Sequence, residues 1–236
     1  MIGIVIPAHN EEQAIRVCLA AVRLAATHPL LKGEPIETVV VLDDCSDATG
    51  VLAASSGALT VSVRARNVGM ARAVGAQALL ARGARWLAFT DADTVVSEAW
   101  LANQLALQAD VVCGTVGVQD WSPHGGNADL LQAHFSETYF DRDDHRHVHG
   151  ANLGVSADAY RSVGGFRHLV SGEDEALVAA LVASGYRVAW SSLPRVVTSA
   201  RVDARAPKGF AGALLNAVAQ RLAEAAAPLQ AASVPV

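Results

Sequence analysis

The sequence predicts an α/β protein in which a mostly parallel, twisted sheet carries helices on both faces and forms one compact domain. Short apolar runs rich in β-branched residues alternate with helical patterns through roughly the first 90 residues, an order typical of doubly wound sheets. Hydrophobic residues make up 52% of the chain and charged residues 17%. This composition supports a large apolar core and argues against extended disorder.

The elements follow from apolar runs and from the residues that cap them. Pro7, which has no N–H group, is expected to end a first strand at Ile2–Ile6. Asn10 is expected to cap the next helix, with Gln13 as its capping-box partner. The chain then alternates in the order strand Thr38–Leu42, helix Ala48–Ser56, strand Leu59–Val63, helix Met70–Arg82 and strand Trp86–Phe89.

The second part of the chain is less regular. Residues Val111–Val118 and Arg187–Ser191 have strand patterns, and a helix is expected from Glu173 to Ser184. Residues 119–150 are polar, rich in histidine and aspartate, and show no clear period. This change of pattern near residue 119 indicates two halves within one compact unit.

Composition also excludes some classes of protein. The net charge is -5 and no segment concentrates lysine or arginine, so no nucleic-acid partner is expected. The three cysteines are far apart and form no zinc motif, which fits a reducing compartment. The first residues lack the features of a signal peptide, and no apolar run is long enough to span a membrane. We expect a cytoplasmic protein, or one bound at the inner face of the membrane.

Polar residues follow four of the expected strands directly. The carboxyl ends of parallel strands share one edge of a sheet, which is where ligands bind. These residues should therefore line a common pocket with carboxylates at its floor. The four clusters are residues 7–11 (PAHNE), 43–46 (DDCS), 64–67 (RARN) and 90–93 (TDAD).

Asp91 and Asp93 come directly after a buried strand. In an extended segment two such residues point the same way, and their carboxylates repel each other. A divalent cation would relieve this repulsion, and hard oxygen ligands suit Mg²⁺ or Mn²⁺. The alternative is that one aspartate caps the next helix while the other is solvated.

Two helix starts carry further candidates. Gly69 would let the backbone approach an anion at a helix N-terminus, and Arg72 would bind a phosphate; the alternative is a turn glycine and an exposed arginine. Glu173 and Asp174 begin a later helix. Asp174 would act there as a general base, unless both acids only complement the helix dipole.

Polar residues of the later loops are candidates for binding a second substrate. His149 ends an alternating series with His145 and His147, and it precedes Gly150, Ala151 and Asn152. A metal site formed by the three histidines is the alternative. Arg201 and Arg205 would close over an anionic group, or else belong to a solvated basic loop.

The chain resembles the family 2 glycosyltransferases of the GT-A fold over roughly residues 2–195. Each motif alone is weak, but six of them occur in the order of the family. They read IVIPAHNEE, VVVLDDCSDAT, RNVGMARAVG, FTDADT, GANLGVSADAYRSVGGF and GEDEAL.

The resemblance implies an inverting enzyme that moves a sugar from a UDP- or GDP-type donor to an acceptor hydroxyl, with Mn²⁺ or Mg²⁺ as cofactor. It implies a donor-binding half at residues 1–118, an acceptor-binding and catalytic half at residues 119–208, and a helical tail at residues 209–236. Its implied donor-binding residues are Pro7, Ala8, Glu11, Asp44, Gly69, Arg72 and Asp91. Asp93 and Asp91 would hold the metal, Asp174 would be the base, and Glu173 would position that base or the acceptor.

Two departures from the family pattern limit what carries over. Cys45 replaces a usual glycine in the base-contacting loop, and the QxxRW-type motif of processive synthases is absent after residue 190. We therefore expect a single hexose transfer to a small molecule, a glycan or a lipid-linked acceptor. The oligomeric state, including a homodimer, stays open.

Two other classes of function stay open as rivals. A nucleotidyltransferase that makes nucleotide sugars should carry a basic, glycine-rich loop after the first strand, where this chain has the acidic PAHNEE. A non-catalytic nucleotide-sugar-binding protein should have lost some of its acids, yet Asp91, Asp93, Glu173 and Asp174 are all present.

Overall fold

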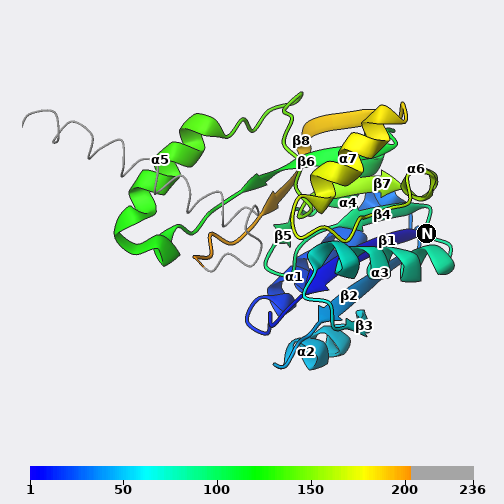
Figure 1. The fold of residues 1–236 in the computed structure, drawn as a ribbon, viewed down its shortest axis with the longest axis horizontal. Helices are drawn as coiled ribbons and strands as arrows, with labels where there is room; N and C mark the ends of the chain where they lie inside the picture. Colours follow the sequence, from blue (N-terminus) through cyan, green and yellow to red (C-terminus); the bar gives the residue numbers. More distant parts are fainter. Residues whose placement is uncertain (203–236) are drawn as a thin grey trace, which may run out of the picture. The chain divides into compact units, whose positions relative to one another are not determined.

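The computed structural model describes residues 1–202, and its centre is a mixed eight-stranded sheet. The strand order across the sheet is β3-β2-β1-β4-β7-β6-β8-β5 (Figure 1). The strands are β1 Ile2–Ala8, β2 Ile36–Asp43, β3 Leu59–Val63, β4 Trp86–Phe89, β5 Val95–Val96, β6 Val111–Gly117, β7 Leu153–Ser156 and β8 Val188–Val197. The predicted α/β class is thus confirmed.

Most neighbouring strands of the sheet are parallel. Strand β1 pairs in parallel with β2 and β4, β2 with β3, and β6 with β8. Strand β7 runs antiparallel to both β4 and β6, and β5 runs antiparallel to β8. The carboxyl ends of β1 to β4 therefore lie at one edge, as the sequence predicts.

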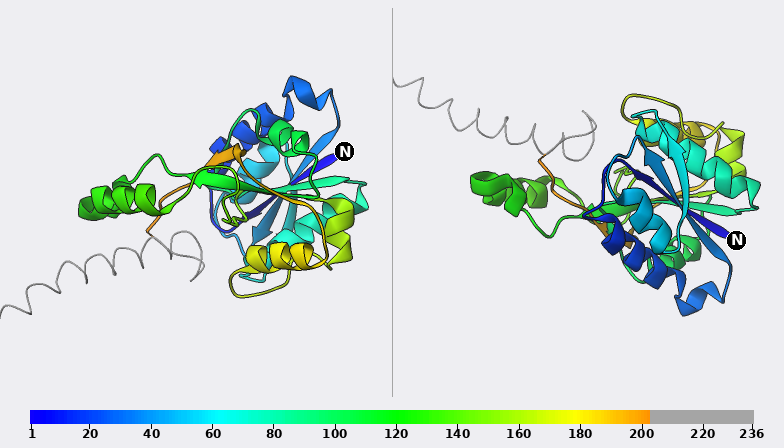
Figure 2. Two further views of the ribbon diagram at one scale, coloured as in Figure 1. Left: turned by 90° about the horizontal axis from the view of Figure 1, so that it is seen from above. Right: turned by 90° about the horizontal axis from the view of Figure 1, so that it is seen from below.

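Helices cover both faces of the sheet. Helices α3, α6 and α7 lie on one face, and α1 and α4 lie on the other with α2 beside α1 (Figure 2). Their bounds are α1 Ile15–Ala26, α2 Thr49–Ser55, α3 Val68–Ala81, α4 Trp100–Ala106, α6 Ala157–Ser162 and α7 Glu173–Ala183, with a short 3₁₀ helix, η1, at Pro29–Leu31. In these described residues, no helix combines the length and apolar character needed to cross a membrane.

The chain forms two compact units. Residues Met1–Gly117 and Asp141–Thr198 contain the sheet, and Val118–Phe140 belongs to the second unit together with residues 199–202. The second unit holds η2 Ser122–Asn127 and α5 Ala128–Thr138, with Trp121, Leu131 and Ala200 in a small apolar cluster. Helix α5 has no apolar period to reveal it, because only Leu131 of the helix is buried.

The division into donor and acceptor halves concerns binding and stays a prediction. The expected tail at residues 209–236 lies outside the described residues.

Helix α3 packs closely against one face of the central strands. Val5, Leu87 and Phe89 point toward α3 and join a core cluster with Leu79. At Gly75 in α3, a Cβ atom would lie 2.6 Å from Val5 Cγ1 and 2.9 Å from Val41 Cγ2. The glycine therefore lets α3 approach β1 and β2 closely.

The expected ends of the first two elements are wrong. Strand β1 continues through Pro7 to Ala8. The Val5 carbonyl accepts from Thr90 N, so Pro7, two residues on, faces the same side beyond the last pair of β4. No ladder hydrogen bond is lost there. Asn10 does not cap α1, which begins at Ile15; instead Asn10 Oδ1 accepts from Ser46 N at 2.8 Å.

Candidate active site

The loops after β1, β2 and β3 are bound together through Asp43. Its Oδ1 accepts hydrogen bonds from the Ala65 and Arg66 amides at 2.7 and 2.8 Å, and its Oδ2 accepts from Asn67 N at 2.7 Å. Its carbonyl lies 2.6 Å from His9 Nδ1. The predicted convergence is therefore confirmed for the polar ends of β1, β2 and β3, while a common pocket at this edge stays a prediction. Asp43 is not among the site residues predicted from the sequence, although its place at the end of a strand is a signal that could have found it.

A polar rim borders this edge of the sheet. Asp44 is exposed, and its Oδ2 lies 3.5 Å from Arg66 Nη1, which also contacts His9 Nε2 at 2.9 Å. Asn10, Asp44 and Arg66 all have positive φ angles of 49° to 54°. Conformations of this kind are uncommon outside glycine and gather at functional sites.

The start of α3 is shaped by close packing. Asn67 caps the helix, because its Oδ1 accepts from Met70 N at 2.8 Å. A Cβ atom at Gly69 would lie 2.5 Å from the Arg167 carbonyl and 3.1 Å from Glu173 Cβ. The glycine is thus required for the protein to pack against itself, and a contact of Gly69 with the donor stays a prediction.

Arg72 forms the centre of the site. Its side chain is buried, at 4% exposure, and its Nη2 donates to Asp91 Oδ1 at 2.6 Å. Its Nη1 donates to Glu173 Oε1, and its guanidinium carbon lies 5.9 Å from the centroid of the Phe166 ring. Arg72 therefore joins the end of β4 to the start of α7. Both terminal nitrogens of Arg72 already bind carboxylates. A direct bond from Arg72 to a diphosphate therefore stays a prediction.

Gly150 closes over the guanidinium. A Cβ atom at this position would lie 2.3 Å from Arg72 Cζ, so any side chain would displace Arg72 from its carboxylates. The Gly150 amide also donates to Asp174 Oδ2 at 2.7 Å. One backbone unit thus shapes both the ion-pair cluster and the carboxylate beside it.

The charges of this cluster act on one another strongly. Burial raises the pKa of Glu173, against the opposing charge of Arg72 and with help from Asp174. Burial alone would lower the pKa of Arg72, but Asp91, Glu173 and Asp174 outweigh it and raise that pKa. The charge of Asp174 contributes to the pKa shifts of both Glu173 and Arg72, so the four groups lie within electrostatic reach of one another.

Asp174 is held in a fixed orientation. Its Oδ2 accepts from the Gly150 amide, and its Oδ1 accepts from the Glu175 amide at 2.9 Å. A carboxylate oxygen can accept more than one hydrogen bond, and the residue is only partly buried. This arrangement suits a base that receives a proton from a bound hydroxyl group.

Asp91, Asp93 and Glu11 gather around the buried thiol of Cys18. Burial raises the Cys18 pKa, and so do the charges of Asp93, Asp91 and Glu11. The thiol donates to the Asp91 carbonyl at 3.4 Å. Cys18 is not among the site residues predicted from the sequence.

A metal ion held by Asp91 and Asp93 would need further ligands from a bound substrate. Within residues 1–202, no three histidine, cysteine or acidic side chains are grouped closely enough to hold a metal ion. Magnesium sites commonly combine one or two carboxylates with substrate phosphates and water. The two aspartates fit that kind of site.

Several other predicted site residues have clear positions. At the end of β1, Ala8 is buried and Pro7 is partly exposed, and Ala151, which precedes β7, is also buried. Asn152 is also buried: its Oδ1 accepts from Trp100 Nε1 at 2.9 Å and its Nδ2 donates to the Thr115 and Pro194 carbonyls. Its side-chain amide is thus occupied by the protein, and a contact of Asn152 with the acceptor stays a prediction.

The structure does not test the two arginines expected to close over an anion. Arg201 belongs to the second unit, and Arg205 lies outside the described residues. Their roles stay predictions.

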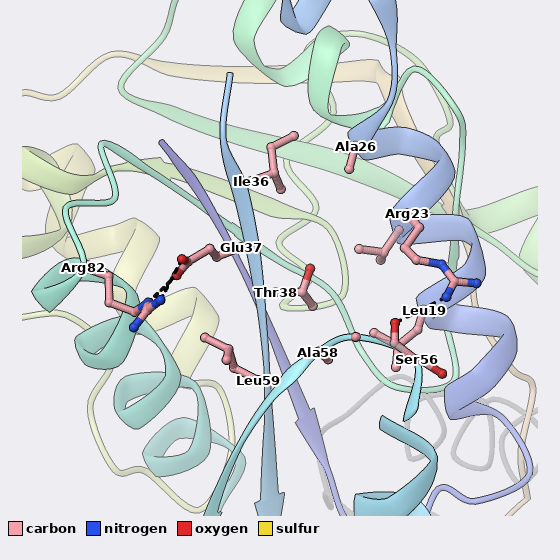
Figure 3. A pocket seen from close by; sticks show the side chains of 12 residues that line it. Leu19, Arg23, Ala26, Ile36, Glu37, Thr38, Ser56, Ala58, Leu59 and Arg82 are labelled. Carbon is pink, nitrogen blue, oxygen red and sulfur yellow. Dashed lines mark hydrogen bonds and ion pairs between the residues drawn. The ribbon is translucent and has the colours of Figure 1, made fainter. Parts of the chain in front are cut away.

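A groove on another part of the sheet does not belong to the site. It encloses about 370 Å³ between α1, the first residues of β2 and the loop before β3 (Figure 3). Its charged groups are paired, since Arg82 binds Glu37 and Arg23 donates to the Ser56 carbonyl (Figure 3). The groove lies at the amino end of β2, away from the acids at the carboxyl edge.

In open α/β sheets ligands bind outside the carboxyl ends of the strands, which is the edge that carries the acids of this chain. The sequence model described as Glycosyl transferase family 2 matches residues 3–164. Since this match spans more than half of the sequence, the chain belongs to glycosyl transferase family 2. No curated protein sequence matched the chain.

Solved structures share the fold at low sequence identity. S. aureus TarS 1-349 in complex with UDP-GlcNAc has 15% identity and a TM-score of 0.63, over 89% of this chain and 61% of that one. The mannosyltransferase PcManGT from Pyrobaculum calidifontis, with GDP-Man and Mn²⁺, has 19% identity and a TM-score of 0.58, over 83% and 56%.

A third structure has the same fold. Glucosyl-3-phosphoglycerate synthase from Mycobacterium tuberculosis, with Mn²⁺ and UDP-glucose, has 19% identity and a TM-score of 0.57, over 85% of this chain and 72% of that one. The present chain thus spans about three fifths of the TarS and PcManGT chains. These similarities confirm the GT-A fold.

Replacing Arg72 with methionine should lower the free energy of unfolding by about 3–5 kcal/mol, the usual effect of removing one partner from a buried ion pair. Arg66→Met is the matched control, because Arg66 pairs with Asp44 at the surface and should contribute no more than about 1 kcal/mol. Denaturant unfolding of both variants measures the difference. Equal effects of the two substitutions would contradict the central position given to Arg72.

The stability of the protein should fall as the pH drops from about 6.5 to about 4 because of His149. Burial lowers the pKa of His149 from 6.5 to about 4, although Asp174 opposes this shift. The unfolded chain then binds the proton more readily than the folded chain, so the stabilising contribution is complete above pH 6.5 and is lost toward pH 4. Denaturant unfolding at several pH values should show a smaller slope in His149→Gln than in the wild type; identical slopes would contradict the assignment.

Proposed function

We propose that the protein is an inverting, metal-dependent glycosyltransferase that moves one hexose from a UDP- or GDP-type donor to an acceptor hydroxyl. The acceptor is a small molecule, a glycan or a lipid-linked sugar. The observation that carries this proposal is the cluster in which Arg72 holds Asp91 and Glu173 beside Asp174. In a family 2 chain, that cluster supplies acids for both sides of a transfer reaction.

The donor nucleotide would bind at the loops that Asp43 joins. Pro7, Ala8 and Glu11 would lie along the nucleoside, and Asp44 on the polar rim would contact the base or the ribose. The similar structures contain UDP-GlcNAc, GDP-Man and UDP-glucose. Those ligands support a nucleotide-diphosphate sugar here without selecting the base.

Asp93 and Asp91 would hold a divalent cation, Mn²⁺ or Mg²⁺. When bound, such a cation neutralises charge on the departing diphosphate as a Lewis acid. Arg72 would orient Asp91 for this task, since the ion pair already fixes one of its oxygens. Two of the similar structures contain Mn²⁺.

Asp174 would remove the proton from the acceptor hydroxyl. As the acceptor oxygen bonds to the anomeric carbon, the bond from that carbon to the diphosphate breaks and the diphosphate leaves with the electron pair. The hydroxyl proton passes to Asp174, and attack from the face opposite the leaving group inverts the anomeric carbon. Glu173 would act through Arg72 as a positioning residue, because its carboxylate binds the guanidinium.

Asp174→Asn should lower turnover about 10²–10⁴-fold, the usual contribution of a general base, while donor affinity stays nearly unchanged. Asparagine keeps the shape and can still accept from the Gly150 amide. Glu175→Gln is the matched control, because Glu175 is the next residue of the same helix and is exposed. Steady-state kinetics of both variants decide the matter, and normal turnover of Asp174→Asn would remove Asp174 from this role.

Asp93→Ala should weaken the metal-dependent part of nucleotide binding, because it removes one of the two carboxylates that would hold the cation. Calorimetry of UDP and GDP, with and without Mn²⁺, measures this part directly. Glu98→Ala, at an exposed acid in the loop after β5, is the control and should bind like the wild type. Binding that ignores Mn²⁺ in the wild type would count against metal dependence, and unchanged affinity in Asp93→Ala would refute the ligand assignment.

A further inference from the structure

The loop at residues 167–172 lies between two residues that contact Arg72. Before the loop, the centroid of the buried Phe166 ring lies 5.9 Å from the Arg72 guanidinium carbon. After the loop, Glu173 begins α7 and accepts a hydrogen bond from Arg72 Nη1. The proposed base, Asp174, is the next residue of this helix. The conformation of the loop therefore bears directly on where the acids of α7 lie.

Burial holds this loop only weakly. The side chains of residues 167–170 are exposed, and that of Val170 is exposed at 81%. Segments with so little buried apolar surface open at a low cost in free energy. In the described part of the chain, a single hydrogen bond reaches residues 167–171, and it runs from Asn67 Nδ2 to the Leu169 carbonyl at 2.9 Å.

The side-chain amide of Asn67 has two fixed partners. Its Oδ1 accepts from Met70 N at 2.8 Å, and its Nδ2 donates to the Leu169 carbonyl. A backbone N–H group can only donate and a carbonyl can only accept, so these two bonds allow one orientation of the amide. The cap of α3 and the loop before α7 therefore depend on the same side chain.

Asn67 also belongs to the donor side of the site. Its backbone amide donates to Asp43 Oδ2 at 2.7 Å, and Asp43 joins the loops after β1, β2 and β3. Two residues further on, a Cβ atom at Gly69 would lie 2.5 Å from the Arg167 carbonyl and 3.1 Å from Glu173 Cβ. The start of the loop and the residue that follows it therefore both pack against the first turn of α3.

We propose that Asn67 is a positioning residue for the acids of α7. Its bond to the Leu169 carbonyl holds the loop against α3, and the held loop keeps Glu173 and Asp174 where the acceptor hydroxyl meets them. Asn67 acts through the loop and makes no contact with either substrate. It joins the loops proposed to bind the donor to the residues proposed to act on the acceptor.

This inference rests on the proposed transfer reaction and adds a residue that positions its base. Loss of the bond to Leu169 should let the loop leave α3 more often, which loosens the first residues of α7. Turnover should then fall, because removal of a proton needs a base held within hydrogen-bond distance. The donor should bind as before, since the Asn67 backbone keeps its bond to Asp43.

Two substitutions remove this bond and keep the helix cap. Asn67→Ser leaves a hydroxyl group that can accept from Met70 N, and Asn67→Asp keeps the shape and the cap, but neither has an amide nitrogen to donate to Leu169. Only Asn67→Asp adds a charge, so an effect common to both variants reports the lost bond. Asn103→Asp is the matched control, because Asn103 Nδ2 donates to the Leu193 carbonyl at 3.0 Å from α4, on the other face of the sheet (Figure 2).

Limited digestion with trypsin measures the loop, because trypsin cleaves after arginine and Arg167 is exposed. Cleavage after Arg167 should be about 3- to 10-fold faster in Asn67→Ser and Asn67→Asp than in the wild type, the usual worth of one hydrogen bond. The rate reports the population of the open loop when opening is fast relative to cleavage. Asn103→Asp should be cleaved there like the wild type.

Hydrolysis of UDP-glucose and GDP-mannose with Mn²⁺ measures the positioning, since water then takes the place of the acceptor. Titration with UDP or GDP counts the nucleotide-binding sites, so that turnover is expressed per folded site. At saturating donor, this turnover should fall about 2- to 10-fold in both Asn67 variants, while the donor KM of Asn67→Ser stays within about twofold of the wild type. Asn103→Asp should keep both values.

Two outcomes would overturn this inference alone. One is cleavage after Arg167 that is no faster in the Asn67 variants than in Asn103→Asp, and the other is faster cleavage with an unchanged turnover per site. A wild type that binds neither nucleotide or consumes neither donor would instead overturn the proposed function, and the trypsin digestion would still decide whether Asn67 holds the loop.

Discussion

The buried ion pairs of Arg72 are the constraint on which the rest of the site depends. A guanidinium at 4% exposure is stable only where carboxylates surround it, so Asp91 and Glu173 must come to it from β4 and α7. Gly75 brings α3 against the sheet, and Gly150 leaves room for the guanidinium. Packing and charge thus determine each other, and Asp174 is placed beside the cluster as a consequence.

Much of this arrangement could be predicted from the sequence because its signals are local. Strands β3 and β4 begin and end where their apolar runs do, since turn residues bound both runs. The edge at which the acids meet follows from the parallel order of β1 to β4. Asp91 could be singled out because it follows the apolar run of β4, and Asp174 because it lies at the start of α7.

The remaining features depend on contacts between distant residues and left no local signal. Gly69 resembles a glycine of an anion-binding loop, yet it packs against the Arg167 carbonyl. Asn152 sits in a polar segment, yet its amide joins α4, β6 and β8 inside the protein. Asn10 is a residue type that often caps helices. In this protein it instead accepts from Ser46 in the loop after β2, and this tertiary contact outweighs the local preference.

The central claim is that acids from distant elements surround a single site for a metal and a diphosphate at the carboxyl edge of the sheet. Anomalous diffraction from a crystal grown with UDP or GDP and Mn²⁺ tests it most directly. The claim predicts one manganese peak beside Asp93, with the nucleotide diphosphate against the Arg72 cluster. A peak elsewhere, such as in the groove between α1 and β2, or a nucleotide bound away from these acids, would contradict it.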